Sequence, residues 1–145
     1  MQASFSMPVQ LRWSDFDANF HLRHSAYYDF GAMARIHFLN EAGLTETVFR
    51  QHSFGPILFK EECTFRKEIK MGDEISIGCE LLQCRPNGSR FAIRHSIVRA
   101  DGTLCAELNV WGDWIDFGTR KLLHPPEWLA QLMAKLPKHP DFQYL

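Results

Sequence analysis

The chain lacks long apolar runs and any marked excess of one charge. No apolar stretch approaches the ~20 residues that a membrane-spanning helix needs, so no transmembrane span is expected. Basic and acidic side chains nearly balance, at 16 and 17, which leaves a net charge of −1. No run of like charge is longer than a pair, which argues against charged tails and against nucleic acid as the main partner.

Cysteine is scarce, and its spacing indicates no pairing. The four cysteines form no C-x-x-C motif, so neither a zinc ribbon nor a thioredoxin-like redox pair is expected. Three of them fall in strand-like sequence, where a free cysteine behaves as a small buried hydrophobe. Residues 1–10 carry neither the basic segment nor the apolar segment of a signal peptide. Together these absences predict a reduced, cytoplasmic setting.

The bulk composition is that of an ordinary globular domain. A chain of 145 residues, of which 46% are hydrophobic, is long enough to bury a core of its own. We therefore predict a single domain over residues 1–145. Aromatic residues make up 13% of the chain and include 12 Phe. This surplus favours a large core, an apolar ligand tunnel or a subunit interface.

Hydrophobic periodicity divides the chain into one long helix and five strands. Residues 26–42 are apolar nearly all round, between an N-cap at Ser25 and a stop at Gly43, and predict a helix that is covered on most sides. A short helical segment is expected at 45–52, and Pro125-Pro126 opens a C-terminal helix over about 127–136. Period-two alternation predicts strands over residues 8–13, 57–69, 74–84, 89–100 and 103–117, with a bulge at Gly112.

The connections between the later strands predict their direction. Asn87-Gly88 and Asp101-Gly102 are dipeptides of type I′ hairpin turns, which join antiparallel neighbours. The expected fold is therefore α+β, with a five-stranded antiparallel sheet packed against one long central helix. Because one helix cannot cover both faces of such a sheet, the other face must meet solvent or another sheet.

The segment between the first strand and the long helix concentrates chemically active side chains. Asp15, Asp17, His21 and His24 fall within ten residues, directly before the helix N-terminus. Three interpretations are open. The carboxylates cap the loop and the helix; the four side chains bind zinc, manganese or iron, although their spacing matches no metal signature; or a carboxylate acts as base or nucleophile on a thioester whose oxygen is stabilised by the first-turn N–H groups.

The same segment resembles a family motif. Hotdog-fold thioesterases of the 4-hydroxybenzoyl-CoA thioesterase and tol-pal-associated acyl-CoA thioesterase group carry Asp-x-Asp-x-x-Gly-[His/Val]-x-x-[Asn/His]-x-x-Tyr directly before the long helix. Asp15, Asp17, His21, His24 and Tyr27 occupy these positions. The order strand, helix, four strands is also that of the hotdog fold, and the resemblance covers about residues 7–120. It implies an acyl-CoA thioesterase that forms a homodimer or homotetramer, has its site at the subunit seam and needs no metal or other cofactor.

The resemblance also implies roles for individual residues. Asp17 takes the position of the catalytic carboxylate, with His24 and His21 in support and the amides at 24–26 holding the thioester oxygen. The acyl slot is expected to be lined by Phe20, Ser25 and Tyr27 and, on the partner's side, by Phe59. Among the basic side chains elsewhere, the candidates for binding the coenzyme A phosphates are Arg66, Lys67 and Arg90.

One residue departs from the motif and keeps other functions open. Phe20 stands where the family has Gly, which permits φ values and close backbone approach that Phe resists. Phe20 is expected to narrow the acyl slot, or to reshape the loop so that Asp17 points elsewhere. The second interpretation is thus an acyl- or partner-binding hotdog domain without turnover. A third, a hydratase or dehydratase on the same fold, needs a His–acid pair elsewhere, and the remaining candidate acids for a related site are Glu41, Glu61 and Glu62.

Overall fold

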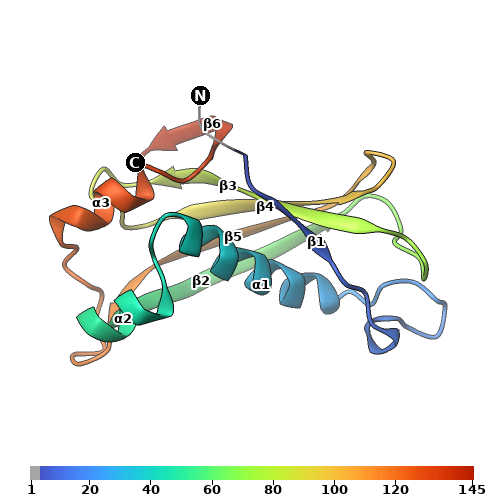
Figure 1. The fold of residues 1–145 in the computed structure, drawn as a ribbon, viewed down its shortest axis with the longest axis horizontal. Helices are drawn as coiled ribbons and strands as arrows, with labels where there is room; N and C mark the ends of the chain where they lie inside the picture. The colour runs from blue at the N-terminus through green and yellow to red at the C-terminus, as the bar shows by residue number, and fades with distance from the viewer. Residues whose placement is uncertain (1–3) are drawn as a thin grey trace.

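A long helix lies across a strongly curved sheet in the computed structural model, which describes residues 4–145 (Figure 1). The predicted long helix is confirmed, and it ends two residues before Gly43, whose φ of 91° stops it. The elements in chain order are β1 (Ser6–Val9), a 3-10 turn (Trp13–Asp15), α1 (Ala26–Glu41), α2 (Glu46–His52), β2 (Phe54–Phe65), β3 (Ile75–Cys84), β4 (Ala92–Arg99), β5 (Leu104–Asp116), α3 (Glu127–Met133) and β6 (Lys138–Tyr144).

The sheet has six strands, so the prediction of five was wrong. Five of them follow the order β1-β3-β4-β5-β2 and are antiparallel to their neighbours. The sixth, β6, runs parallel to β3 and pairs with it at 81–84. The short strand β1 covers only 75–78 of the same β3 edge and leaves the rest of that edge for the C-terminal segment. The sequence predicts no strand in this segment, and the predicted C-terminal helix over 127–136 is three residues longer than α3, which ends at Met133.

Both predicted hairpins are present, but their turns are not of type I′. In the β3–β4 turn only Gly88 has a positive φ, and in the β4–β5 turn only Gly102 does. A type I′ turn needs positive φ at both central residues. Here the closing bonds run from Arg85 N–H to Ser89 O and from Arg99 N–H to Thr103 O, so each turn has three central residues, and the glycine is the last of them.

The helix α1 packs closely on the sheet through small residues. A Cβ on Gly31 would lie 2.1 Å from Leu108 Cδ2, so the absence of a side chain lets the helix backbone approach β5 directly. The opposite side of the helix is more open than its apolar composition predicts. Met33 and Ile36 are 53% and 56% exposed. The helix is therefore partly uncovered, at Met33 on the side of β1 and at Ile36 on the side of β2.

Strand β2 forms one edge of the sheet and is irregular at its middle. Its register with β5 shifts between Leu58 and Lys60, opposite Gly112, where a Cβ would meet the Ile57 carbonyl at 2.4 Å. The bulge predicted at Gly112 is thus present, with the extra residue, Phe59, on β2. Phe59 and Phe65 are both half-exposed on this edge. Among the described helices, none is both long and apolar enough to cross a bilayer.

Candidate active site

The loop before α1 is anchored by Asp15, which is fully buried. Its carboxylate accepts hydrogen bonds from Arg12 at the backbone N–H (2.8 Å), Nε (3.3 Å) and Nη2 (2.8 Å), and Arg23 Nη2 lies 3.7 Å away. Its backbone carbonyl accepts from the Arg23 N–H at 2.8 Å. The Arg12 guanidinium holds the pKa of Asp15 below its usual value against the opposing effect of desolvation. Asp15 therefore has a structural role, joining the end of the first strand to the approach of the helix.

Asp17 is the first residue of a tight turn that ends at His21, and it is exposed. Its N–H donates to the His21 carbonyl at 2.9 Å, which closes the turn. One carboxylate oxygen, Oδ1, accepts from the backbone N–H groups of Asn19 (2.8 Å) and His21 (3.2 Å). The other oxygen, Oδ2, makes no hydrogen bond or ion pair with any residue in 4–145. Asp17 thus caps its own turn with one oxygen and presents the other to solvent.

Phe20 adopts the backbone conformation that glycine favours. Its φ is 62°, and its N–H donates to the Asp17 carbonyl at 3.0 Å. A positive φ is unfavourable for a residue that carries a Cβ, so the backbone of the turn is strained at Phe20. The ring itself is 62% exposed. It stands outside the core, beside the Asp17 carboxylate in sequence and in the same turn.

The two histidines of the motif face different surroundings. His21 Nε2 lies 3.3 Å from Glu68 Oε2, and its backbone bridges to Lys70. His24 is exposed, one residue before Ser25. Across residues 4–145, no three His, Cys, Asp or Glu side chains converge as metal ligands would, so the four polar residues of this loop do not form such a cluster.

The start of α1 is positioned by Arg23 and by the ring of Tyr27. Ser25 is the N-cap residue, but its hydroxyl accepts from Arg23 Nη1 instead of capping a helix N–H. Tyr27 is buried, with its ring edge-on to Phe65 of β2 at 4.9 Å between centroids. Burial raises the pKa of Tyr27 to about 12, so the side chain remains a phenol. The Ala26 N–H, one of the amides expected to hold the thioester oxygen, is already donated to the Arg23 carbonyl at 3.0 Å. The other amides of the first turn have no acceptor within the helix, as at any helix start.

The remaining predicted binding residues do not gather at this site within one chain. Phe59 lies six residues before Phe65 on β2, about 20 Å along an extended strand. Arg90 accompanies Phe59: its guanidinium stacks on that ring at 5.0 Å, and its Nε lies 3.0 Å from Asp113 Oδ2. Arg66 and Lys67 follow Phe65 directly, near the start of α1, and Arg66 is paired with Glu107 at 3.1 Å. The three candidate phosphate ligands therefore fall into two groups.

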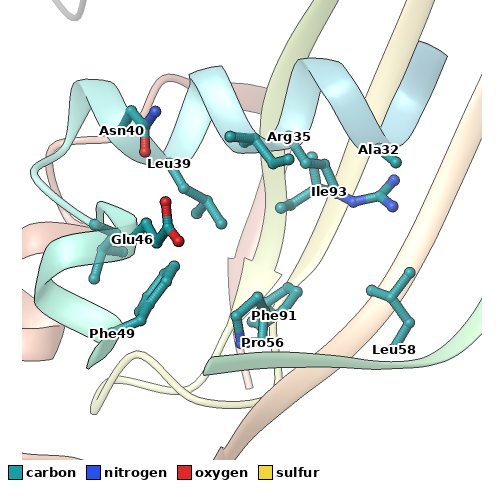
Figure 2. A pocket seen from close by; sticks show the side chains of 12 residues that line it. Ala32, Arg35, Leu39, Asn40, Glu46, Phe49, Pro56, Leu58, Phe91 and Ile93 are labelled. Atoms are coloured by element: carbon teal, nitrogen blue, oxygen red, sulfur yellow. The ribbon is translucent and has the colours of Figure 1, made fainter. Parts of the chain in front are cut away.

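A pocket of about 480 Å³ opens between α1, α2, β2 and β4, at the α2 end of the long helix (Figure 2). Its wall is almost entirely apolar apart from Arg35, Asn40 and Glu46, and no motif in the sequence pointed to it. We call it the α1–α2 pocket; it is lined by Ala32, Arg35, Ile36, Leu39, Asn40, Leu44, Glu46, Phe49, Pro56, Leu58, Phe91 and Ile93. The one sequence signal for it was Arg35, a rare charge inside an otherwise apolar helix.

A curved antiparallel sheet around one long helix, with a carboxylate turn directly before that helix, defines a hotdog-fold domain. The chain belongs to the thioesterase-like superfamily, whose family model matches residues 11–133. No curated protein matches the chain significantly.

Solved structures share the fold at low sequence identity. A Staphylococcus aureus protein, determined in complex with CoA, is 19% identical, with a TM-score of 0.85 over 92% of this chain and 84% of its own. The DHNA-CoA thioesterase of Staphylococcus aureus is 14% identical, with a TM-score of 0.80 over 91% and 89%. The probable thioesterase YbaW of Escherichia coli is 18% identical, with a TM-score of 0.79 over 92% and 98%.

Proposed function

We propose that this protein is an acyl-CoA thioesterase and that Asp17 is its catalytic carboxylate. The observation that carries the proposal is the Asp17 side chain: it stands exposed in the turn before α1, with Oδ2 unengaged, in a chain of the thioesterase-like superfamily. The neighbours named as CoA thioesterases, and the one determined with CoA, support the substrate class.

The chemistry needs a base or nucleophile and a donor for the carbonyl oxygen. Asp17 Oδ2 takes a proton from a water molecule as that water attacks the thioester carbon, or attacks the carbon itself to form an anhydride that water then cleaves. In both routes the C–S bond breaks, and the coenzyme A thiolate takes up a proton as it leaves. The first-turn amides of α1 stabilise the negative charge that develops on the carbonyl oxygen.

The neighbouring residues take supporting roles in this proposal. His21 and His24, four and seven residues after Asp17 in the chain, assist proton transfer. Phe20, Ser25 and Tyr27 bound the thioester end of the acyl slot. Arg66 and Lys67 lie at the same end of α1 and are placed to meet a coenzyme A phosphate, whereas Arg90 belongs to the far end of β2.

The proposed active unit is a homodimer or a homotetramer. Strand β2 is an edge with backbone groups unpaired on one side, and Phe59 and Phe65 are half-exposed along it. Ile36, which lines the α1–α2 pocket together with Pro56 and Leu58 of β2, extends this surface onto α1. Half-exposed aromatic side chains on an unpaired strand edge favour association with a second chain. A second copy on this surface would close the site at the seam and bring a second Phe59 toward it.

A second function, acyl or partner binding without turnover, is favoured by one observation. Asp17 Oδ1 is committed to two amides of its own turn, which is the arrangement of a purely structural loop aspartate. If this is its whole role, the carboxylate contributes to the shape of the loop and to nothing else.

The variant Asp17→Asn separates the two functions. The amide oxygen of Asn still accepts the hydrogen bonds from Asn19 and His21, so the turn is retained while the base or nucleophile is lost. A panel of acyl-CoAs is assayed by the release of free thiol. We expect wild-type turnover and a fall in kcat of about 10²- to 10⁴-fold in the variant. The matched control is Asp141→Asn, an exposed carboxylate near the C-terminus, which should leave kcat unchanged.

Two results would reject the mechanism. Equal turnover in wild type and Asp17→Asn removes the carboxylate from catalysis. Stable acyl-CoA binding without thiol release assigns the chain to the second function. Light scattering of the wild-type protein tests the assembly separately, and a monomer at assay concentrations would contradict it.

A further inference from the structure

A positively charged side chain, that of Arg35, lies in the otherwise mostly apolar wall of the α1–α2 pocket. Arg35 extends from the middle of α1 toward Ala32 and over Leu58 (Figure 2). Its Nη1 lies 3.4 Å from where a Cβ on Gly31 would be, so the guanidinium reaches back one helical turn through the space that this glycine leaves. The side chain is partly buried, and desolvation lowers the pKa of Arg35.

The guanidinium is held in place by a histidine rather than by a carboxylate. His95 of β4 is fully buried, and its Nδ1 lies 2.8 Å from the Leu108 carbonyl. Because that carbonyl only accepts, Nδ1 carries the proton, and Nε2 accepts from Arg35 Nη1 at 3.4 Å. No carboxylate of residues 4–145 lies within ion-pair distance of Arg35. The acid that lines the same pocket, Glu46, is already paired with Arg50 at 2.6 Å.

This arrangement leaves an oriented guanidinium inside an apolar pocket with no carboxylate in direct contact. Glu61 of β2 attracts it only from beyond ion-pair distance, which opposes the effect of desolvation on the pKa of Arg35. A carboxylate is its best partner, because two parallel N–H···O bonds to a charged acceptor are among the strongest in proteins. The pocket is also within reach of the proposed thioester position. Gly31, which the guanidinium adjoins, is five residues after Ala26, or about 8 Å along the helix axis.

We propose that the α1–α2 pocket receives the distal end of the acyl group, and that Arg35 selects acyl groups that end in a carboxylate. The substrate class is then the coenzyme A monothioesters of dicarboxylic acids. This inference rests on the proposed thioesterase function and adds its specificity. Arg35 binds the distal carboxylate, the apolar wall packs against the methylene chain, and His95 is a positioning residue that fixes the guanidinium.

The test compares matched substrates that differ only at the distal end. Adipyl-CoA is compared with hexanoyl-CoA, and suberyl-CoA with octanoyl-CoA, in wild type and in Arg35→Met, which keeps an unbranched stem but removes the guanidinium and its charge. We expect wild type to favour the dicarboxylic member of each pair by kcat/KM, and Arg35→Met to lose about 10- to 100-fold on that member alone. Arg85→Met, which removes a positive charge outside the pocket, is the control and should preserve the preference.

Each alternative outcome has a distinct meaning. Equal kcat/KM within the wild-type pairs, or an equal loss on both members in Arg35→Met, overturns the inference and leaves the thioesterase proposal standing. If Arg35→Met changes the oligomeric state but keeps the dicarboxylic preference, a second copy supplies the counter-ion of Arg35. That result also overturns the inference.

Two further measurements keep the result decisive. If no acyl-CoA is hydrolysed, the thioesterase proposal fails. Calorimetric binding of adipyl-CoA and hexanoyl-CoA to the wild-type protein then tests whether Arg35 selects a distal carboxylate, and equal affinities reject that role. If Arg35→Met does not fold, Arg35→Gln replaces it, because an amide still donates to His95. Retention of the full dicarboxylic preference in that uncharged variant contradicts the inference.

Discussion

The buried His95 should make the protein less stable as the pH falls from neutral to mildly acidic values. Burial, and then the nearby charge of Arg35, lower the pKa of His95 to about 3, against the opposing effect of the Leu108 hydrogen bond. In the unfolded chain the same side chain has a pKa of about 6.5. Below about pH 6.5, His95 is protonated in the unfolded state but stays neutral in the folded state, so the free energy of unfolding decreases with falling pH.

The size of this effect follows from the two pKa values. A single group with this shift contributes a slope of about 1.4 kcal/mol per pH unit once the pH is well below 6.5. Between about pH 7 and about pH 5 the expected loss is therefore about 2 kcal/mol, and the loss continues until the pH reaches the folded-state value near 3. This stability is fully present only above the unfolded-state pKa.

Urea unfolding at a series of pH values and a fixed protein concentration measures this loss. The variant His95→Gln keeps an amide donor for the Leu108 carbonyl but cannot titrate, so its curve should be flatter than that of wild type by about 2 kcal/mol over the same interval. The comparison of slopes is independent of how stable the variant is at neutral pH. Parallel curves for wild type and variant would refute the reasoning, because they would show that His95 is protonated as easily in the folded state as in the unfolded state.

Three further predictions concern the loop and the helix. Asp15→Asn should lower the free energy of unfolding by about 1.5–3 kcal/mol at neutral pH. The difference from wild type should shrink below about pH 4, because the wild-type carboxylate, whose pKa is lowered in the folded state, becomes protonated as the pH falls. Urea midpoints at neutral pH and at about pH 3 check both parts. Phe20→Gly should raise stability by up to ~1 kcal/mol, since it removes the cost of a positive φ and retains the turn; a lower melting temperature would show that the exposed ring makes stabilising contacts instead. Gly31→Ala should lower stability by about 1–3 kcal/mol despite a helix-propensity gain of about 1 kcal/mol, because the new Cβ collides with Leu108; a stabilised variant in thermal melts would mean that the helix shifts freely on β5.

Most of the fold could be predicted from the sequence because the patterns that indicate it involve residues close together in the chain. The alternation in β3, β4 and β5 and the glycines that end their turns are properties of a few adjacent residues, and the structure confirms them. Strand β6 carried no such signal. It has prolines nearby and a polar composition, and it is a strand because β1 leaves part of the β3 edge unpaired. Pairing of this kind depends on tertiary contacts, which no window of sequence contains.

The candidate site likewise has features that the sequence predicts and features that it does not. The residue pattern alone marked Asp15 and Asp17 equally, as two carboxylates in similar sequence surroundings, and only the family resemblance put the catalytic role on Asp17. What separates them is the position of Arg12 and Arg23, which enclose Asp15 and leave Asp17 outside. The contact between Arg35 and His95 could not be predicted from the sequence either, because the two residues are 60 positions apart. Spacing reveals which side chains share an element, but not which of them lack a counter-ion.

The turn-capping and catalytic interpretations of Asp17 are not mutually exclusive. A carboxylate has about four acceptor positions on two oxygens, and the turn uses two of them, both on Oδ1. Those two hydrogen bonds fix the plane of the carboxylate, so they orient Oδ2 without occupying it. A catalytic group gains from being held in place before the substrate arrives. Asp17→Glu is therefore the more discriminating companion to Asp17→Asn: it keeps the acid but moves it by one methylene away from the amides that orient it. Activity near the wild-type level in Asp17→Glu would mean that the turn does not position the reacting oxygen, whereas a loss comparable to that in Asp17→Asn would show that its orientation matters as much as its charge.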